Sequence, residues 1–270
     1  MQRQPRPWRG RSVSWLVLLG TQLAASVGQA AGAAAPEPPR ELLVFAAASL
    51  REACTALQPA FEQSHPGLHL RFNFAGSQEL RTQLEQGARA DVFLSADRRQ
   101  MELARQAGVV GPEQPLVSNI PVLVVPRANP AGLMRFADLP TVKRLVVGAP
   151  EVPIGHYTLE LLERANQVLG ADFSARVEAR VVSRELNVKQ VLTKVLLGEA
   201  DAGIVYQSDA VSALARVQVV PIPVDINVVA HYPMAVVQRS SQPALATAYL
   251  QFLVSPTSQA VFAASGFGPP

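Results

Sequence analysis

The sequence predicts an α/β protein of two lobes, each a mostly parallel sheet flanked by helices, joined by a two-segment hinge. Three observations support this. Apolar runs of strand length alternate with segments of helical periodicity along most of the chain. A long apolar segment at 120–125 interrupts that alternation and begins a second unit. The 270 residues are 49% hydrophobic, which is enough for two ordinary cores and excludes general disorder.

The first residues differ in composition from the rest. Four arginines precede the apolar stretch 13–27, and small residues follow, so we predict a signal peptide at 1–31 and a Pro/Ala-rich spacer at 32–40. The apolar stretch is too short for a comfortable membrane span, and an uncleaved anchor is the alternative. Without those four arginines, 20 basic residues face 21 acidic ones, a net charge of −1. The basic pI near 9.3 therefore gives no argument for nucleic-acid binding.

The first lobe is expected to begin with a strand at 41–46 and a helix at 50–63, in which Ser49 and Glu52 have the spacing of a capping box. The single cysteine, Cys54, falls on the apolar face of that helix and is expected to be buried and unreactive. The alternation continues with strands and helices expected at 68–74, 78–86, 91–94 and 97–107.

The second unit is expected to alternate in the same way. Its strands and helices are predicted at 120–125, 144–148, 156–169, 180–182, 188–197 and 202–206. A strand at 232–237 and helices at 244–254 and 258–264 then follow. We expect the chain to return to the first lobe there, so that lobe 1 is 41–118 plus 232–270 and lobe 2 is 119–231.

Several strand-to-helix turns consist of small residues. Ser77 is expected to cap its helix, Gly155 to leave neighbouring N–H groups uncovered, and Asn187 to cap the helix that begins at Val188. The N-terminal N–H groups of a helix are unsatisfied and favour an anion. Turns at the carboxyl ends of strands in a two-lobed α/β protein converge on the cleft, so the sequence predicts an oxyanion site without charged side chains.

Three segments, 44–50, 90–97 and 198–206, resemble the periplasmic molybdate-binding proteins, the substrate-binding subunits of molybdate ABC transporters, and the likeness extends over about 42–268. The resemblance implies a type II-like periplasmic-binding-protein fold, a periplasmic location, molybdate or tungstate as ligand, and an inner-membrane ABC permease as partner. It also implies a monomer with no enzymatic activity, no cofactor, and molybdenum only as the bound oxyanion.

By motif position, the resemblance implies five ligand-binding residues. Ser49 and Ser77 would donate from hydroxyl and backbone, Ile154 and Val188 from backbone N–H groups, and Tyr206 from its phenol. Ile154 departs from the small residue expected there, and Gly76 stands where a serine is common in the family.

Other interpretations remain open at this point. The same fold could bind sulfate, phosphate or ferric iron, and a periplasmic hydrolase could use Ser49 or Ser77 as nucleophile. His156 lies beside the proposed site in sequence and is a further candidate for the ligand shell. Structural roles are expected for three aspartates: Asp97 as a helix cap, and Asp201 and Asp209 as residues that fix the loop at Tyr206.

Overall fold

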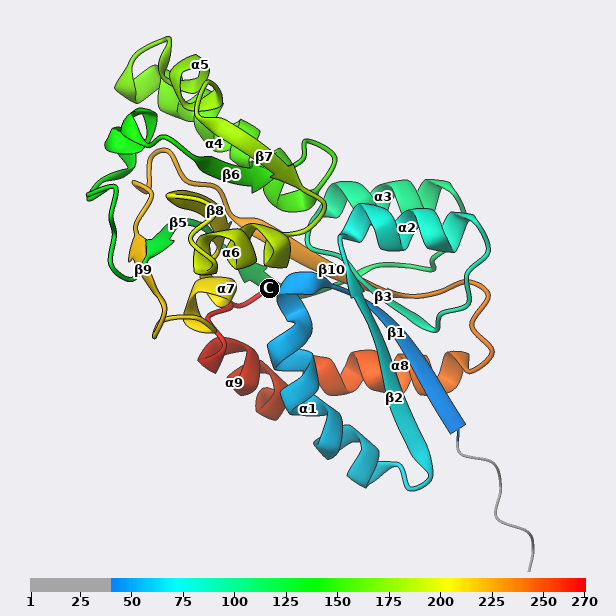
Figure 1. Ribbon diagram of the computed structural model, residues 1–270. Helices are drawn as coiled ribbons and strands as arrows, with labels where there is room; N and C mark the ends of the chain where they lie inside the picture. The colour runs from blue at the N-terminus through cyan, green and yellow to red at the C-terminus, as the bar shows by residue number, and fades with distance from the viewer. Residues whose placement is uncertain (1–39) are drawn as a thin grey trace, which may run out of the picture. The chain divides into compact units, whose positions relative to one another are not determined.

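The computed structural model describes residues 40–270, which belong to one compact unit. The predicted signal peptide at 1–31 and nearly all of the predicted spacer at 32–40 lie outside the described residues. Two five-stranded sheets carry the fold (Figure 1). Within residues 40–270, no helix combines the length and the apolar character that a membrane crossing requires.

The first sheet has the order β2-β1-β3-β10-β4. Its strands are β1 (Arg40–Ala47), β2 (Leu68–Ala75), β3 (Val92–Leu94), β4 (Gln114–Asn119) and β10 (Ala230–Val236). β1 pairs in parallel with both β2 and β3, whereas β10 runs antiparallel to both β3 and β4. Four strands therefore point one way and β10 alone is reversed.

The second sheet repeats this arrangement in the order β7-β6-β8-β5-β9. Its strands are β5 (Pro121–Pro126), β6 (Leu145–Gly148), β7 (Val181–Glu185), β8 (Ala202–Tyr206) and β9 (Val217–Val220). β6 is parallel to β7 and β8, and β5 is antiparallel to β8 and β9. The predicted α/β class of two lobes is thus confirmed, with sheets that are mixed because each contains one reversed strand.

Helices flank both sheets (Figure 1). They are α1 (Arg51–Ser64), α2 (Ser77–Glu85), α3 (Arg98–Gln106), α4 (Pro153–Leu169), α5 (Phe173–Glu178), α6 (Val188–Leu196), α7 (Gln207–Val211), α8 (Pro243–Leu253) and α9 (Pro256–Ala264), with 3₁₀ turns η1 (Ala48–Leu50) and η2 (Phe136–Thr141). α2 lies beside α3 and α1 beside α9. The parallel β-α-β order requires such crossover helices, because a hairpin cannot join parallel strands.

The chain crosses between the sheets twice. Only Ile120 separates β4 from β5, and residues 221–229 connect β9 back to β10. Asn119 braces the first crossing, because its side chain donates to Ser208 Oγ at 2.9 Å and accepts the N–H of Ile120. The second crossing contains a turn in which Ile226 and Asn227 donate to Pro223 O, and neither crossing contains a helix or strand of its own. Hinges in two-lobed proteins form at such connections.

The single cysteine lies in the core of the first lobe. Cys54 is fully buried, as predicted, and burial raises the pKa of its thiol to about 12. On β1 and β3 the side chains alternate: Phe45 and Phe93 pack with α2 and α3, whereas Val44 and Val92 belong to the cluster that includes α1.

The sequence predicts that Asp201 fixes the loop at Tyr206, but the structure gives this residue another role. Its carboxylate lies at the start of β8 and ties that strand to the start of β6. Oδ2 accepts the backbone N–H groups of Lys143 and Arg144 at 3.1 and 2.9 Å, and Oδ1 accepts the Arg144 guanidinium at 2.8 Å. Burial by itself raises the pKa of this carboxyl, but the hydrogen bonds from Arg144 and the backbone lower the pKa overall.

We expect Asp201→Asn to lower the free energy of unfolding at pH 7 by about 1–2 kcal/mol, because several hydrogen bonds lose their ionised acceptor. A carboxyl whose pKa falls on folding stabilises the protein above the unfolded pKa of about 3.9, and this contribution is lost as pH falls through the folded pKa. Urea unfolding of wild type and variant should therefore differ at pH 7, and the difference should shrink as pH falls below the unfolded pKa of about 3.9. Asp172→Asn, which removes an exposed helix ion pair with Arg176, should change little at either pH. A constant difference at both pH values would contradict the assignment.

Candidate functional site

A narrow cavity lies where turns from both sheets meet. The space between these turns is about 220 Å³, below the usual size of a pocket for an organic ligand, so it suits one compact group. All its lining residues are uncharged. They are Ala47, Ala48, Ser49, Ala75, Gly76, Ser77, Ala96, Val152, Pro153, Ile154, Asn187, Val188 and Tyr206. The five residues that the resemblance singled out are all among them.

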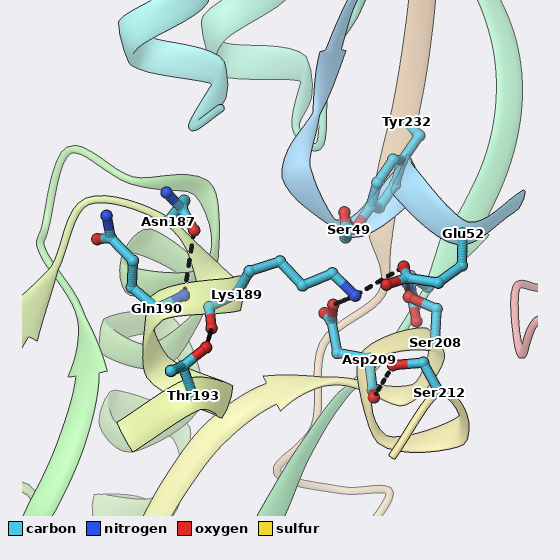
Figure 2. A network of polar contacts seen from close by, with 11 residues as sticks. Ser49, Glu52, Asn187, Lys189, Gln190, Thr193, Ser208, Asp209, Ser212 and Tyr232 are labelled. Carbon is cyan, nitrogen blue, oxygen red and sulfur yellow. Dashed lines mark hydrogen bonds and ion pairs between the residues drawn. The ribbon is translucent and has the colours of Figure 1, made fainter. Parts of the chain in front are cut away.

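Ser49 reaches the cavity from η1, the 3₁₀ turn between β1 and α1. The predicted capping box is wrong, because the N-cap of α1 is Leu50 and no side chain caps it. The buried Ser49 hydroxyl instead lies 3.0 Å from the hydroxyl of Tyr232 on β10 (Figure 2). When Tyr232 donates in this pair, the Ser49 hydrogen remains available to a ligand. The tertiary contact with β10 thus replaces the local cap that the spacing suggested.

Ser77 comes from the start of α2. The expectation that Ser77 caps this helix is wrong: Gly76 is the N-cap, and Ser77 is the first helical residue. Ser77 Oγ accepts the backbone N–H of Ala96 at 2.9 Å, which leaves the hydroxyl hydrogen free to donate. The N–H groups of Ser77 and Gln78 have no acceptor within the helix, since the first intrahelical bonds to Gly76 O come from Glu79 and Leu80.

Ile154 lies in the first turn of α4, which begins at Pro153, three residues earlier than predicted. Proline fits the first helical position, since it has no N–H to satisfy. The first bond back to Val152 O comes from His156, so the N–H groups of Ile154 and Gly155 have no acceptor within the helix. Ile154 is buried and is one of the residues that line the cavity.

Val188 opens α6, and Asn187 caps this helix as predicted. The Asn187 side chain accepts the N–H of Gln190 at 3.2 Å (Figure 2). Since the cap satisfies Gln190 and Asn187 O accepts from Val191, the N–H groups of Val188 and Lys189 remain without a partner inside the helix.

Tyr206 ends β8 and lines the cavity with only 1% of its surface exposed. Its ring packs edge-on between Tyr157 and Tyr232, at centroid distances of 6.4 and 5.7 Å. Its hydroxyl is buried without a hydrogen-bond partner in the described structure. Burial raises the pKa of Tyr206 well above its ordinary value, so the phenol remains a donor at neutral pH. An unpaired buried hydroxyl is costly, and a ligand that accepts from it would remove that cost.

The other sequence candidates lie outside the cavity wall. His156 is on α4 but is not a lining residue, and its ring lies 5.9 Å from that of Tyr157. Asp97 caps α3 as predicted, accepting the N–H of Gln100 at 2.7 Å. Asp209 pairs with Lys189, and a hydrogen bond from the backbone of Tyr206 also lowers the pKa of its carboxyl, in line with the predicted role at that loop. Among residues 40–270, no cluster of three histidine, cysteine or carboxylate side chains could hold a metal ion.

Side chains connect the two lobes around the cavity. Gln78 Nε2 donates to Leu186 O at 2.8 Å, and Gln100 Nε2 donates to Glu151 O at 3.1 Å. Lys189 of the second lobe contacts Glu52 of the first at 2.7 Å. Sequence reasoning found none of these contacts, nor the bond between Ser49 and Tyr232, because each joins residues more than 50 positions apart.

Two sheets of the same topology, with a small uncharged cavity between turns of both, define a two-lobed binding protein. The chain belongs to the bacterial extracellular solute-binding proteins, whose family model matches residues 42–268. The molybdate-binding protein ModA of Mycobacterium tuberculosis is 39% identical over 97% of this chain and 99% of its own length. Among solved structures, the substrate-binding domain of a putative molybdenum ABC transporter from Clostridium difficile is 30% identical, with a TM-score of 0.63 over 85% of this chain and 99% of that one.

The fold alone does not select a ligand. The sulfate-binding protein SubI of Mycobacterium tuberculosis superposes with a TM-score of 0.77 over 85% of this chain and 87% of its own, at 21% identity. The comparison supports the architecture, and the choice of ligand depends on the site.

Proposed function

We propose that the protein binds molybdate, and tungstate by the same geometry, for delivery to an ABC permease of the inner membrane. The observation that carries this proposal is the buried, unpartnered hydroxyl of Tyr206 at a cavity whose lining contains no charged side chain. The relatives named for molybdate binding support the same ligand.

The ligand donors would be Ser49 and Ser77 from the first lobe, and Ile154, Val188 and Tyr206 from the second. A buried dianion needs compensation, and each hydrogen bond to an ionised acceptor contributes about 1.5–3 kcal/mol. The starts of α2, α4 and α6 add the favourable end of the helix dipole. Since no lining residue is a base, a ligand that must donate a hydrogen would find few acceptors there.

Sulfate and phosphate are the first alternatives, and a sulfate-binding protein of this fold makes sulfate the one to test. A smaller anion cannot reach donors from both lobes at once, so some would remain desolvated and unpaired. Calorimetric titration of residues 32–270 with molybdate, tungstate, sulfate and phosphate separates these possibilities. Tighter binding of sulfate than of molybdate would overturn the proposed ligand.

The remaining alternatives fit the site less well. Ferric iron favours carboxylate and phenolate ligands, whereas Tyr206 is the single tyrosine and no carboxylate lines the cavity. For a serine hydrolase, Ser49 or Ser77 would need a general base. The recorded partners of their hydroxyls are Tyr232 and the backbone of Ala96, neither of which is a base. We therefore propose a binding protein without catalytic activity or cofactor.

We also propose a periplasmic location for the protein and a movement of its two lobes relative to each other. Export through the signal peptide predicted at 1–31 would place a monomer in the periplasm. The boundaries proposed for the lobes are 41–118 plus 232–270 and 119–231, which agree within two residues with the crossings at Ile120 and before β10. Closure would follow ligand binding, since donors from both lobes are satisfied together only in the closed form.

We expect Tyr206→Phe to weaken molybdate binding about 10- to 150-fold, the equivalent of one hydrogen bond to an ionised acceptor. The melting temperature without ligand should hardly change, because the hydroxyl has no partner within the described structure. Titration calorimetry measures the affinity and differential scanning fluorimetry the stability.

Tyr249→Phe is the matched control. The Tyr249 hydroxyl is also buried, but it lies in the first lobe beside Phe61 and the Cys54 thiol, away from the cavity. Its removal should leave affinity unchanged. Equal affinities of wild type and Tyr206→Phe would exclude Tyr206 from the site.

A further inference from the structure

Lys189 forms two ion pairs behind the proposed site. Its Nζ lies 2.7 Å from Glu52 Oε2 and 2.9 Å from Asp209 Oδ1, and its side chain is only 19% exposed (Figure 2). Asp209 is fully buried, and no other cation pairs with it among the described residues. Neither Lys189 nor its two partners line the cavity.

Lys189, Glu52 and Asp209 form a charged triad, and each of the three lies within three residues of a proposed ligand residue in the sequence. Lys189 follows Val188 in the first turn of α6, Asp209 follows Tyr206 by three residues in α7, and Glu52 follows Ser49 by three at the start of α1. The triad therefore joins the three turns that present Val188, Tyr206 and Ser49. Two of these turns belong to the second lobe and one to the first.

The contact between Lys189 and Glu52 joins the second lobe to the first. Among residues 40–270, it is the one ion pair that connects the two lobes, since every other pair lies within one of them. Figure 2 shows the Lys189 side chain extended from α6 toward both carboxylates. Opening of the lobes would break the contact with Glu52 while the contact with Asp209 stays within the second lobe.

Lys189 keeps its positive charge although its side chain is mostly buried. Burial alone lowers the pKa of its ammonium, but the carboxylates of Asp209 and Glu52 raise it overall. Burial raises the pKa of Asp209, and Lys189 opposes that rise. The buried pair with Asp209 fixes where the ammonium lies, so the reach toward Glu52 requires little further ordering of the lysine side chain.

We propose that Lys189 is a positioning residue of the oxyanion site. Through its contact with Glu52, Lys189 holds the turn of Ser49 close to the turns of Val188 and Tyr206 in the closed form. This contact slows release of the ligand. This inference rests on the proposed function. Because the contact forms only after the lobes close, it acts on the dissociation rate and leaves the association rate nearly unchanged.

The test is stopped-flow kinetics with molybdate on wild type and Glu52→Gln. Glu52 is 45% exposed, so the substitution leaves the fold and the buried Lys189–Asp209 pair intact. We expect the dissociation rate to rise about three- to fivefold, as for a partly exposed ion pair. If Glu52 acted merely as a nearby negative charge, its loss would instead tighten binding of a dianion. A dissociation rate that is unchanged or slower would overturn the inference.

Glu102→Gln is the matched control, because Glu102 is 43% exposed and pairs with Arg105 within α3. It should release molybdate at the wild-type rate. An equal acceleration in Glu102→Gln would also contradict the positioning role, since the effect would then come from general charge.

A second set of variants tests Lys189 itself. Lys189→Met alone would leave Asp209 buried without a counter-charge, so it is combined with Asp209→Asn. This double variant should release molybdate as fast as Glu52→Gln, and adding Glu52→Gln to it should produce no further increase. Additive increases would overturn the inference. Absence of molybdate binding by the wild type would instead refute the proposed function, and the inference with it.

Discussion

Gly155→Ala is expected to destabilise the protein strongly. A Cβ at this position would lie 1.9 Å from Ala149 O and 2.6 Å from Gly148 O, both backbone atoms of the same lobe. Alanine normally stabilises a helix by about 1 kcal/mol relative to glycine. Here the start of α4 would have to move away from the end of β6, and we expect a net loss of about 3 kcal/mol. That corresponds to roughly 6–12 °C in melting temperature without ligand.

Gly111→Ala is the control for this prediction. A Cβ at Gly111 would meet its nearest atom, Val236 O, at 3.6 Å, an ordinary contact distance. Its melting temperature should stay near that of wild type. Equal melting temperatures of Gly155→Ala and wild type would show that α4 can shift freely, and would weaken the assignment of Ile154 N–H as a fixed donor.

Gly76→Ala is expected to reduce molybdate affinity with little effect on the stability of the free protein. A Cβ on Gly76 would lie 2.4 Å from Leu186 O, a backbone atom of the opposite lobe, and would also crowd the Gln78 side chain that donates to this oxygen. The clash with Leu186 O exists only when the lobes are closed, whereas the end of the flexible Gln78 side chain can move aside in the free protein. Leu186 lies two residues before Val188, so the displacement would move a proposed ligand donor.

The expected loss is about 1–3 kcal/mol of binding free energy, or roughly 5- to 150-fold in affinity, as for overpacking of a close contact. Calorimetry and thermal melting of Gly76→Ala distinguish the two predicted effects, with Gly111→Ala again as the control. A normal affinity would mean that the ligand-bound form is more open than the structure described above.

Most of the alternation of strands and helices could be predicted from the sequence, because apolar periodicity and caps are local signals. β8 was expected at 202–206 and is found there, and α6 was expected at 188–197 and spans Val188–Leu196. β4, β9, α5 and α7 were not predicted. They are short, and β4 contains Pro115, so their existence depends on the neighbours that they pack against.

The turns of the site were located from sequence, but the roles of their side chains were partly misassigned. Ser49 and Ser77 both carry the local pattern of a helix cap, yet neither hydroxyl caps a helix. Ser49 contacts Tyr232 from β10, and Ser77 accepts from Ala96 after β3. Asn187 and Asp97 do cap their helices, since no tertiary partner competes for their side chains.

The sequence by itself determined which turns end in small residues and begin helices, because backbone conformation and capping depend on neighbours in the chain. It also excluded charged ligand groups at those turns. Only the tertiary structure decided which turns share one cavity, that Tyr206 has no partner for its hydroxyl, and that Lys189 reaches Glu52. These contacts join residues far apart in sequence, and their geometry is set by how the two sheets pack.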